Sequence, residues 1–292
     1  MQNFTDIKKV ETSEIEEILK LAKDFEENKA QSSCAGKHIA LFFMEPSTRT
    51  RFSFEMAANK LNLHKYQFSS STLAKGESLK DAIENLYQLG ISCVVLRHPQ
   101  AGIFDSLISE INCPMHFINA GDGNHTHPTQ AMLDLYTMNK ILGSVKGKKI
   151  SIIGDIKHSR VAHANVTLLK KFGADIWICA PDYFKDEIKD VTITRNLKDA
   201  LKDASVAMTL RVQKERLEDR IPIFDYIHDY GITMKKLQEY APKDVILMHP
   251  GPVNRDVEIA SDVLDSQYGQ TILDQAHNGV FVRMAIVDTL LR

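Results

Sequence analysis

The sequence has few cysteines and no long apolar run. Its 292 residues include four cysteines, Cys34, Cys93, Cys113 and Cys179, and no two of them are close enough in sequence to form a metal-binding pair. Cys93 and Cys179 lie inside apolar runs, so we expect small buried side chains in a reducing compartment rather than disulfides. The longest apolar run, residues 39–44, is far too short to cross a bilayer.

The sequence also lacks an excess of either charge. It carries 36 basic and 38 acidic residues, for a net charge of −2, which gives no reason to expect nucleic acid or an anionic membrane as a partner. Residues 1–17 are mixed and charged, without the apolar core of a secretory signal. We therefore expect a cytoplasmic protein.

Two glycine-rich patterns of nucleotide-binding proteins are missing. No Gly-rich loop ends in Gly-Lys-Ser or Gly-Lys-Thr, so a nucleoside triphosphate is not expected. The apolar run 149–154 ends in one glycine, Gly154, whereas a dinucleotide-binding turn needs several. We therefore expect no nicotinamide cofactor, and no other cofactor is indicated.

Short apolar runs rich in Val, Ile and Phe alternate with stretches of helical spacing. The alternation predicts parallel sheets covered by helices on both faces, which is an α/β fold. The expected buried strands are residues 38–43, 92–96, 115–119, 149–154, 175–179, 206–210 and 245–248. Residues 129–142 are apolar on most faces and predict a buried helix.

A small polar segment, Gly143-Ser144-Val145-Lys146-Gly147, precedes a new strand and predicts a domain boundary. We expect two α/β domains, residues 1–142 and 143–276. The last segment, residues 277–292, is apolar at helical spacing and is expected to pack back on the first domain.

Four arginines follow predicted strand ends in both halves of the chain: Arg49, Arg97, Arg160 and Arg211. Ligands of open parallel sheets bind beyond the carboxyl ends of the strands, and guanidinium groups suit carboxylates and phosphates. A surface arginine is commonly a solvated charge, but four in the same topological position indicate anionic ligands bound between the two domains.

The most specific segment is Ser47-Thr48-Arg49-Thr50, which follows Pro46 at a predicted strand-to-helix turn. Ser47 or Thr48 can cap the helix, and its first turn offers free N–H groups at the positive end of the dipole. Hydroxyl groups and Arg49 complete a predicted cradle for phosphate oxygens. The alternative is an ordinary capped helix start.

A second strand-to-helix junction carries His127-Pro128-Thr129-Gln130. His127 can donate a hydrogen bond to a carbonyl oxygen as charge builds on it. A metal site with His125 lacks a carboxylate or cysteine to complete it, and a capping histidine remains a third possibility. The polar loop 69–78, with Lys75, is either a surface loop or a mobile lid that brings Lys75 to an anion.

These residues carry a family resemblance. The segment from Phe43 to Glu55 resembles the carbamoyl-phosphate signature of the aspartate and ornithine carbamoyltransferases, and residues 127–130 resemble that family's second signature. Lys75-Gly76-Glu77, residues 211–216 and residues 249–255 resemble the aspartate branch. The Ser-Met-Gly and His-Cys-Leu-Pro loops of the ornithine branch do not occur. The similarity extends from about residue 42 to the end of the chain.

The resemblance implies a carbamoyl-phosphate-binding domain at 1–142, an aspartate-binding domain at 143–276, and an active site between them. It implies transfer of the carbamoyl group to L-aspartate in de novo pyrimidine synthesis, without a metal. The implied phosphate ligands are Ser47, Thr48, Arg49 and Thr50. Thr50, Arg97 and His127 would contact the carbonyl oxygen as the catalytic residues, and Gln130 the carbamoyl nitrogen.

The resemblance also implies a homotrimer with shared active sites, in which Ser71 and Lys75 come from the adjacent subunit. The implied aspartate ligands are Lys75, Arg160, Arg211, Gln213 and the backbone at Gly251 and Pro252. Regulatory chains or a dihydroorotase are possible further partners. Two alternatives stay open: a carbamoyltransferase for ornithine or another amino acid, and a non-catalytic anion-binding homologue.

Overall fold

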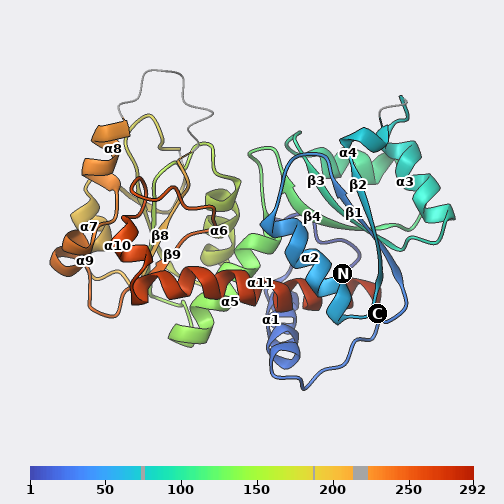
Figure 1. Cartoon of the computed structure of the whole chain (residues 1–292), viewed down its shortest axis with the longest axis horizontal. Helices are drawn as coiled ribbons and strands as arrows, with labels where there is room; N and C mark the ends of the chain where they lie inside the picture. The colour runs from blue at the N-terminus through green and yellow to red at the C-terminus, as the bar shows by residue number, and fades with distance from the viewer. Residues whose placement is uncertain (74–75, 187, 213–222) are drawn as a thin grey trace. The chain divides into compact units, whose positions relative to one another are not determined.

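The computed structural model describes residues 1–73, 76–186, 188–212 and 223–292. The chain forms two compact units, Met1–Tyr136 with Ala276–Arg292, and Thr137–Gln275. Two helices belong to both units: α5 (Pro128–Leu142) begins in the first, and α11 (Gln267–Leu291) ends in it (Figure 1). The first unit is therefore built from the two ends of the sequence.

The first unit contains a parallel sheet with the strand order β2-β1-β3-β4. The strands are β1 (His38–Phe43), β2 (His64–Ser69), β3 (Cys93–His98) and β4 (His116–Asp122). Core residues Ala40, Phe42, Val94 and Leu96 face α3 (Leu79–Gln88) and α4 (Ile103–Glu110). Helices α1 (Thr12–Glu26), α2 (Arg49–Lys60) and the C-terminal part of α11 lie on the other face (Figure 1).

The pairing of β1 with β3 sets the position of the candidate site. Phe43 lies opposite Arg97 in the parallel register, and the N–H group of Met44 donates to the Arg97 carbonyl at 2.9 Å. Both strands are buried on their apolar faces, as is usual for parallel sheets. The carboxyl ends of β1 and β3 consequently lie level, and the loops that follow them begin side by side.

The second unit contains a parallel sheet with the strand order β7-β6-β5-β8-β9. Its strands are β5 (Lys149–Ile153), β6 (Asp175–Cys179), β7 (Thr192–Thr194), β8 (Val206–Thr209) and β9 (Ile246–Met248). Its helices are α6 (Arg160–Lys171), α7 (Leu197–Leu201), α8 (Ile223–Tyr230), α9 (Met234–Tyr240) and α10 (Ser261–Leu264). Helix α6 lies on one face of the sheet, and α7 with α9 on the other (Figure 1).

The predicted α/β fold with parallel sheets is confirmed, and all seven predicted strands are present with ends that differ by a few residues. Two strands were missed. The edge strand β2 is polar and largely exposed, and β7 has three residues. Helix α11 begins at Gln267, ten residues before the predicted start. Arg97 lies inside β3 rather than after it, and Gly121 lies inside β4.

Cys93 and Cys179 are fully buried in β3 and β6, as predicted, and neither is in a disulfide. Among the helices within the described ranges, none is both long enough and apolar enough to span a membrane. The predicted boundary at residues 143–147 lies in the turn between α5 and β5.

Candidate functional site

The turn after β1 delivers three polar residues to the start of α2. Thr48 is the N-cap residue, with φ −81° and ψ −62°, and Arg49 is the first residue of the helix. The predicted capping role is wrong, because the Thr48 side chain accepts no capping hydrogen bond. Thr48 and Arg49 are exposed and Ser47 is half-buried.

This helix start is suited to an anion. The first turn of α2, described in full, holds no acidic residue, although carboxylates commonly stabilise this end of a helix. It carries Arg49, Thr50 and Arg51 instead. The positive end of the helix dipole and the N–H groups of the first turn favour an anion at this position. Phosphate fits such a site, because it combines negative charge with several acceptor oxygens.

Arg97 links the ends of three strands. From β3 its Nε donates to Glu45 Oε1 at 2.8 Å, and Nη1 lies 3.5 Å from the carbonyl oxygen of Ala120 in β4. Glu45 belongs to the turn that follows β1. The Arg97 and Glu45 side chains are only 13% and 20% exposed. The ion pair therefore holds a guanidinium in a fixed position next to the Ser47–Thr50 turn.

Thr50 and His127 come together although 77 residues separate them in sequence. Thr50 Oγ1 lies 3.5 Å from His127 Nε2, and both side chains are buried, with 9% and 4% exposure. The distance is at the limit of a hydrogen bond. A hydroxyl and an imidazole nitrogen so placed can both reach one oxygen atom of a ligand.

Gln130 lies in the first turn of α5, three residues after His127, and is 8% exposed. Its Nε2 donates to Asp134 Oδ1 at 3.0 Å.

Ser71 lies in the short 3-10 helix η2 (Ser70–Leu73) after β2 and is exposed, with its Oγ 2.7 Å from Ser69 Oγ. Lys75, the other residue predicted to come from a neighbouring subunit, lies outside the described residues.

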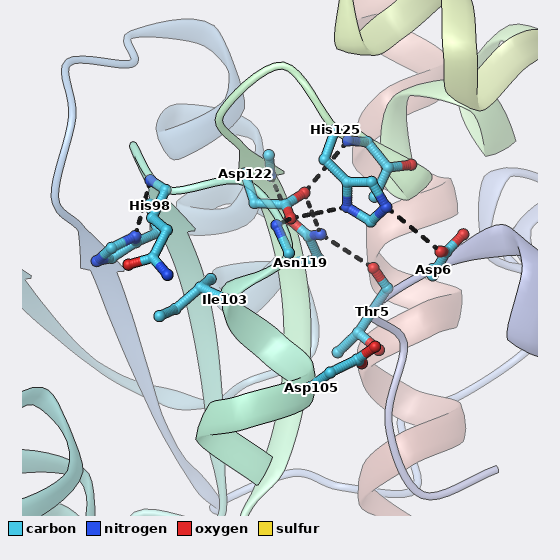
Figure 2. A network of polar contacts seen from close by, with 12 residues as sticks. Thr5, Asp6, His98, Ile103, Asp105, Asn119, Asp122 and His125 are labelled. Atoms are coloured by element: carbon cyan, nitrogen blue, oxygen red, sulfur yellow. Dashed lines mark hydrogen bonds and ion pairs between the residues drawn. The ribbon is translucent and has the colours of Figure 1, made fainter. Parts of the chain in front are cut away.

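The loop that leads to His127 is held by a buried carboxylate (Figure 2). Asp122, 1% exposed, accepts hydrogen bonds from Asn119 Nδ2 at 2.8 Å and from the N–H group of Gly102 at 2.8 Å. It also contacts His125 Nδ1 at 2.9 Å and accepts from the Thr126 N–H group at 3.3 Å. The carboxylate thereby fixes the backbone immediately before His127.

Figure 2 also shows which groups lie next to the His125 side chain. Its Nε2 lies 3.8 Å from Asp6, and the N-terminal segment is joined to the same loop by the hydrogen bond from Asn119 Nδ2 to the Thr5 carbonyl. The two carboxylates near His125 were not found from the sequence. Across the described residues, no group of three or more His, Cys, Asp or Glu side chains could hold a metal ion.

In the second unit, Arg160 and Arg211 follow neighbouring strands. Arg160 is the first residue of α6, after β5, where Ser159 caps the helix by accepting from the Ala162 N–H group at 3.1 Å. Arg211 follows β8, which pairs with β5, and the N–H group of Leu210 donates to the Ile153 carbonyl. The structure thus places both half-buried arginines at one edge of one sheet.

A buried glutamate anchors the segment that carries Arg211. Glu258 is fully buried and accepts from the N–H groups of Val212 at 2.5 Å and Asn254 at 2.8 Å. Burial raises the pKa of the Glu258 carboxyl, and these hydrogen bonds oppose the rise. Glu258 ties the Arg211 segment to the loop after β9. Gln213, also predicted as a ligand, lies outside the described residues.

The loop after β9 contains Gly251 and Pro252, joined by a cis peptide bond, and Gly251 has φ +68°. The Gly251 N–H group donates to His249 Nδ1 at 2.8 Å, and the His249 N–H group donates to Gln275 Oε1 at 2.9 Å. His249 is 1% exposed. The buried His249 side chain therefore holds the loop backbone in place. The polar groups of that backbone can then face a ligand.

Four carboxylates that support the site were missed from the sequence: Glu45, Asp122, Asp134 and Glu258. One spacing carried a signal, because Asp134 follows Gln130 by four residues on a predicted helix and so lies on the same face. Asp122 lies between Gly121 and Gly123 at the end of β4, and nothing in that local pattern indicates a buried acceptor. Each of the four acts through another residue, and single-residue patterns do not reveal such roles.

Comparison with known proteins gives a consistent result. A family model described as "Aspartate/ornithine carbamoyltransferase, carbamoyl-P binding domain" matches residues 2–140, and one described as "Aspartate/ornithine carbamoyltransferase, Asp/Orn binding domain" matches residues 146–290. The aspartate carbamoyltransferase catalytic subunit of Koribacter versatilis is 45% identical, over 99% of this chain and 97% of that protein. The corresponding subunit of Christiangramia forsetii is 43% identical, over 98% and 95%.

Solved structures agree with the sequence relatives. The catalytic subunit of M. jannaschii aspartate transcarbamoylase has a TM-score of 0.87 and 33% identity, over 99% of this chain and 98% of that chain. Aspartate transcarbamoylase from Trypanosoma cruzi in complex with carbamoyl phosphate and aspartate has a TM-score of 0.87 and 27% identity, over 99% and 97%.

The Asp122 network generates a prediction. The Asp122→Ala variant should lower the free energy of unfolding by about 2–4 kcal/mol, because buried donors lose their acceptor. It should also weaken binding of inorganic phosphate severalfold, since His127 follows the loosened loop. Urea unfolding and calorimetric titration measure the two effects. The matched control is Asp105→Ala, which breaks an exposed pair with Lys9 and should change both quantities little. Equal effects of the two substitutions would refute the role given to Asp122.

Proposed function

Because the chain belongs to the aspartate/ornithine carbamoyltransferase family, we propose that it transfers the carbamoyl group of carbamoyl phosphate to L-aspartate. The products are N-carbamoyl-L-aspartate and phosphate, in de novo pyrimidine synthesis. The observation that carries this conclusion is the similarity of nearly the whole chain to aspartate carbamoyltransferase catalytic subunits, at 45% and 43% identity. The proposed domains are residues 1–142 for carbamoyl phosphate and 143–276 for aspartate.

The proposed carbamoyl phosphate site uses the first unit. Ser47, Thr48, Arg49 and Thr50 hold the phosphate at the N-terminus of α2, where free N–H groups and the helix dipole favour an anion. Thr50, Arg97 and His127 contact the carbonyl oxygen, and Gln130 contacts the carbamoyl nitrogen. The proximity of Thr50 to His127 and the fixed position of Arg97 support this assignment.

The proposed aspartate site uses the second unit. Arg160 and Arg211 bind the two carboxylates of the substrate, and their position at one edge of the sheet supports this role. Guanidinium groups bind carboxylates through paired hydrogen bonds. Gln213 and the backbone at Gly251 and Pro252 complete the site, together with Lys75 of an adjacent subunit.

The proposed chemistry is direct attack. The amine of aspartate adds to the carbonyl carbon of carbamoyl phosphate, negative charge develops on the carbonyl oxygen, and phosphate leaves with the bonding electrons. Thr50, Arg97 and His127 stabilise that charge, and each such donor commonly lowers the barrier by about 3–4 kcal/mol. The amine proton passes to the departing phosphate. No protein nucleophile is required, because both substrates are bound and oriented.

We further propose a cytoplasmic homotrimer in which Ser71 and Lys75 complete the phosphate site of the neighbouring subunit. Three exposed apolar side chains near the edge strand support a subunit contact. Phe52 and Met56, one turn apart on α2, are 50% and 48% exposed, and Tyr66 on β2 is 44% exposed. Grouped exposed apolar side chains are typical of protein interfaces. Regulatory chains or a dihydroorotase are candidate further partners.

The decisive test of the function is an assay of carbamoylated product with carbamoyl phosphate and either L-aspartate or L-ornithine. We expect product with L-aspartate alone, because the second unit presents two arginines for two carboxylates, whereas ornithine has one carboxylate and a cationic side chain. Product with ornithine alone would assign the chain to the other branch of the family. No product with any amino acid would favour the non-catalytic homologue.

Substitutions in the two sites should separate the two substrates. Arg49→Ala should raise the KM for carbamoyl phosphate, and Arg160→Ala the KM for aspartate, each by about 10- to 100-fold for the loss of a charge-assisted contact. Steady-state kinetics with each substrate varied in turn measures the split. Arg195→Ala removes an arginine that is 68% exposed and paired with Asp182, and should leave both KM values unchanged. A rise in the same KM for both site variants would contradict the assignment.

Shared active sites predict complementation between inactive variants. Arg49→Ala and Lys75→Ala subunits should each have little activity alone. When they are mixed, dissociated and reassembled, about a quarter of the sites in a cyclic trimer should contain both native residues. Activity and molar mass of the reassembled mixture provide the measurement. Activity that stays at the level of the two parents would show that one chain supplies both residues.

A further inference from the structure

A buried polar cluster in the first unit includes Gln130. It consists of Gln130 and Asp134 on α5 and Arg283 on α11, which are 8%, 0% and 3% exposed. Gln130 Nε2 donates to Asp134 Oδ1 at 3.0 Å. Buried charges at this depth are costly unless they are paired, so a carboxylate and a guanidinium in one cluster require explanation.

The cluster fixes which end of the Gln130 amide faces the carboxylate. A carboxylate accepts hydrogen bonds and donates none, so the amide nitrogen of Gln130 must face Asp134. The amide oxygen then points to the other side. Without a neighbour of defined polarity, an amide can turn over and exchange its oxygen and nitrogen at little cost. Asp134 removes that freedom.

Arg283 is the cationic member of the cluster. The guanidinium is packed over the Phe54 ring at 5.2 Å and donates to the Gly279 carbonyl at 3.2 Å. Burial lowers the pKa of Arg283 to about 10, and the charge of Asp134 opposes this shift. The attraction between the two opposite charges therefore holds the guanidinium and the carboxylate in one cluster.

Helix α11 can bring Arg283 this close because of Gly279. A Cβ atom at this position would lie 2.6 Å from Arg283 Nη1 and 3.0 Å from Leu133 Cδ2 of α5. The C-terminal part of α11 therefore packs tightly against α5 and beside α2, as Figure 1 shows. Arg283 is therefore a buried and closely packed member of the cluster, and not a surface side chain.

We propose that Asp134 is a positioning residue that makes Gln130 selective for an acyl phosphate carrying an amino group. With its nitrogen held by Asp134, Gln130 presents an oxygen, which accepts a hydrogen bond from the –NH₂ group of a carbamoyl group. A methyl group in the same place, as in acetyl phosphate, gives no such bond. This inference rests on the proposed function, since it assigns the substrate group that Gln130 contacts.

The test compares carbamoyl phosphate with acetyl phosphate in the Asp134→Asn variant. The introduced amide is neutral, and the nearby guanidinium, which has only donors, favours the amide oxygen on its own side. An N–H donor then faces Gln130, and the Gln130 amide turns over to accept it. We expect the preference for carbamoyl phosphate over acetyl phosphate to fall about tenfold, the scale of one buried hydrogen bond.

The preference is measured as the ratio of the inhibition constant of acetyl phosphate, as a competitor of carbamoyl phosphate, to the KM for carbamoyl phosphate. The same substitution in a Gln130→Ala background should change the ratio by less than about twofold, because coupled residues are not additive. The matched control is Asp288→Asn on α11, a buried carboxylate that accepts from the Ser33 N–H group at 2.7 Å. This control should lower stability without changing the ratio.

Two outcomes would overturn the proposal. One is an unchanged ratio in a folded Asp134→Asn enzyme, and the other is an equal change in the Gln130→Ala background. If Asp134→Asn fails to fold, Arg283→Met provides a second route, because the carboxylate then loses the cation that lies with it in the cluster. It should reduce the ratio in the same direction, and an unchanged ratio would again refute the proposal. Carbamoyl transfer by the native enzyme is established first, so failure of the proposed function is seen separately.

Discussion

The pairing of β1 with β3 is the constraint on which the first unit depends. The parallel register sets Phe43 opposite Arg97, so the turn after β1 begins where the Arg97 side chain lies. The Glu45–Arg97 ion pair then joins the two strand ends, and the hydrogen-bonded loop after β4 brings His127 to Thr50. A shift of one residue in this register would no longer set Phe43 opposite Arg97, and Glu45 would lose its place beside the guanidinium. The strand register therefore determines which side chains of the candidate site meet.

The charged and polar groups of the candidate site are accompanied by carboxylates from other segments. Carboxylates usually stabilise the start of a helix, yet the first turn of α2 carries two arginines and no acidic residue. The acidic partners lie elsewhere: Glu45 beside Arg97, Asp134 behind Gln130, and Glu258 under the segment with Arg211. Each carboxylate restrains a polar group of the candidate site, and the first turn of α2 keeps only cationic and neutral side chains. This distribution of charge is the one that the proposed anionic substrates would need.

Most strands of the fold and several residues of the candidate site could be predicted from the sequence, because their patterns are local in the chain. Features that depend on packing between distant segments could not. Buried parallel strands such as β1 and β5 are continuous apolar runs and are readily recognised. The edge strand β2 escaped because exposure removes that pattern. Arg49, His127 and Gln130 were predicted because their motifs are local. The groups around these residues could not be predicted, because the ion pair of Arg97 with Glu45 and the proximity of Arg283 to Asp134 depend on packing between segments 52 residues apart or more. The predicted cap at Thr48 was wrong, because the Thr48 side chain accepts no hydrogen bond from the first turn of α2.

The two ends of the chain share one unit, and this has a consequence for the order in which the protein is made. Helix α11 closes the first unit with its final residues, Ala276–Arg292, after the whole second unit has been synthesised. While the ribosome is still at work, the second unit can fold as soon as it emerges, whereas the first lacks the helix that covers α2 and α5. Arg283 can join Asp134 only after the second unit has been synthesised. The first unit is therefore completed last, although most of it is encoded first.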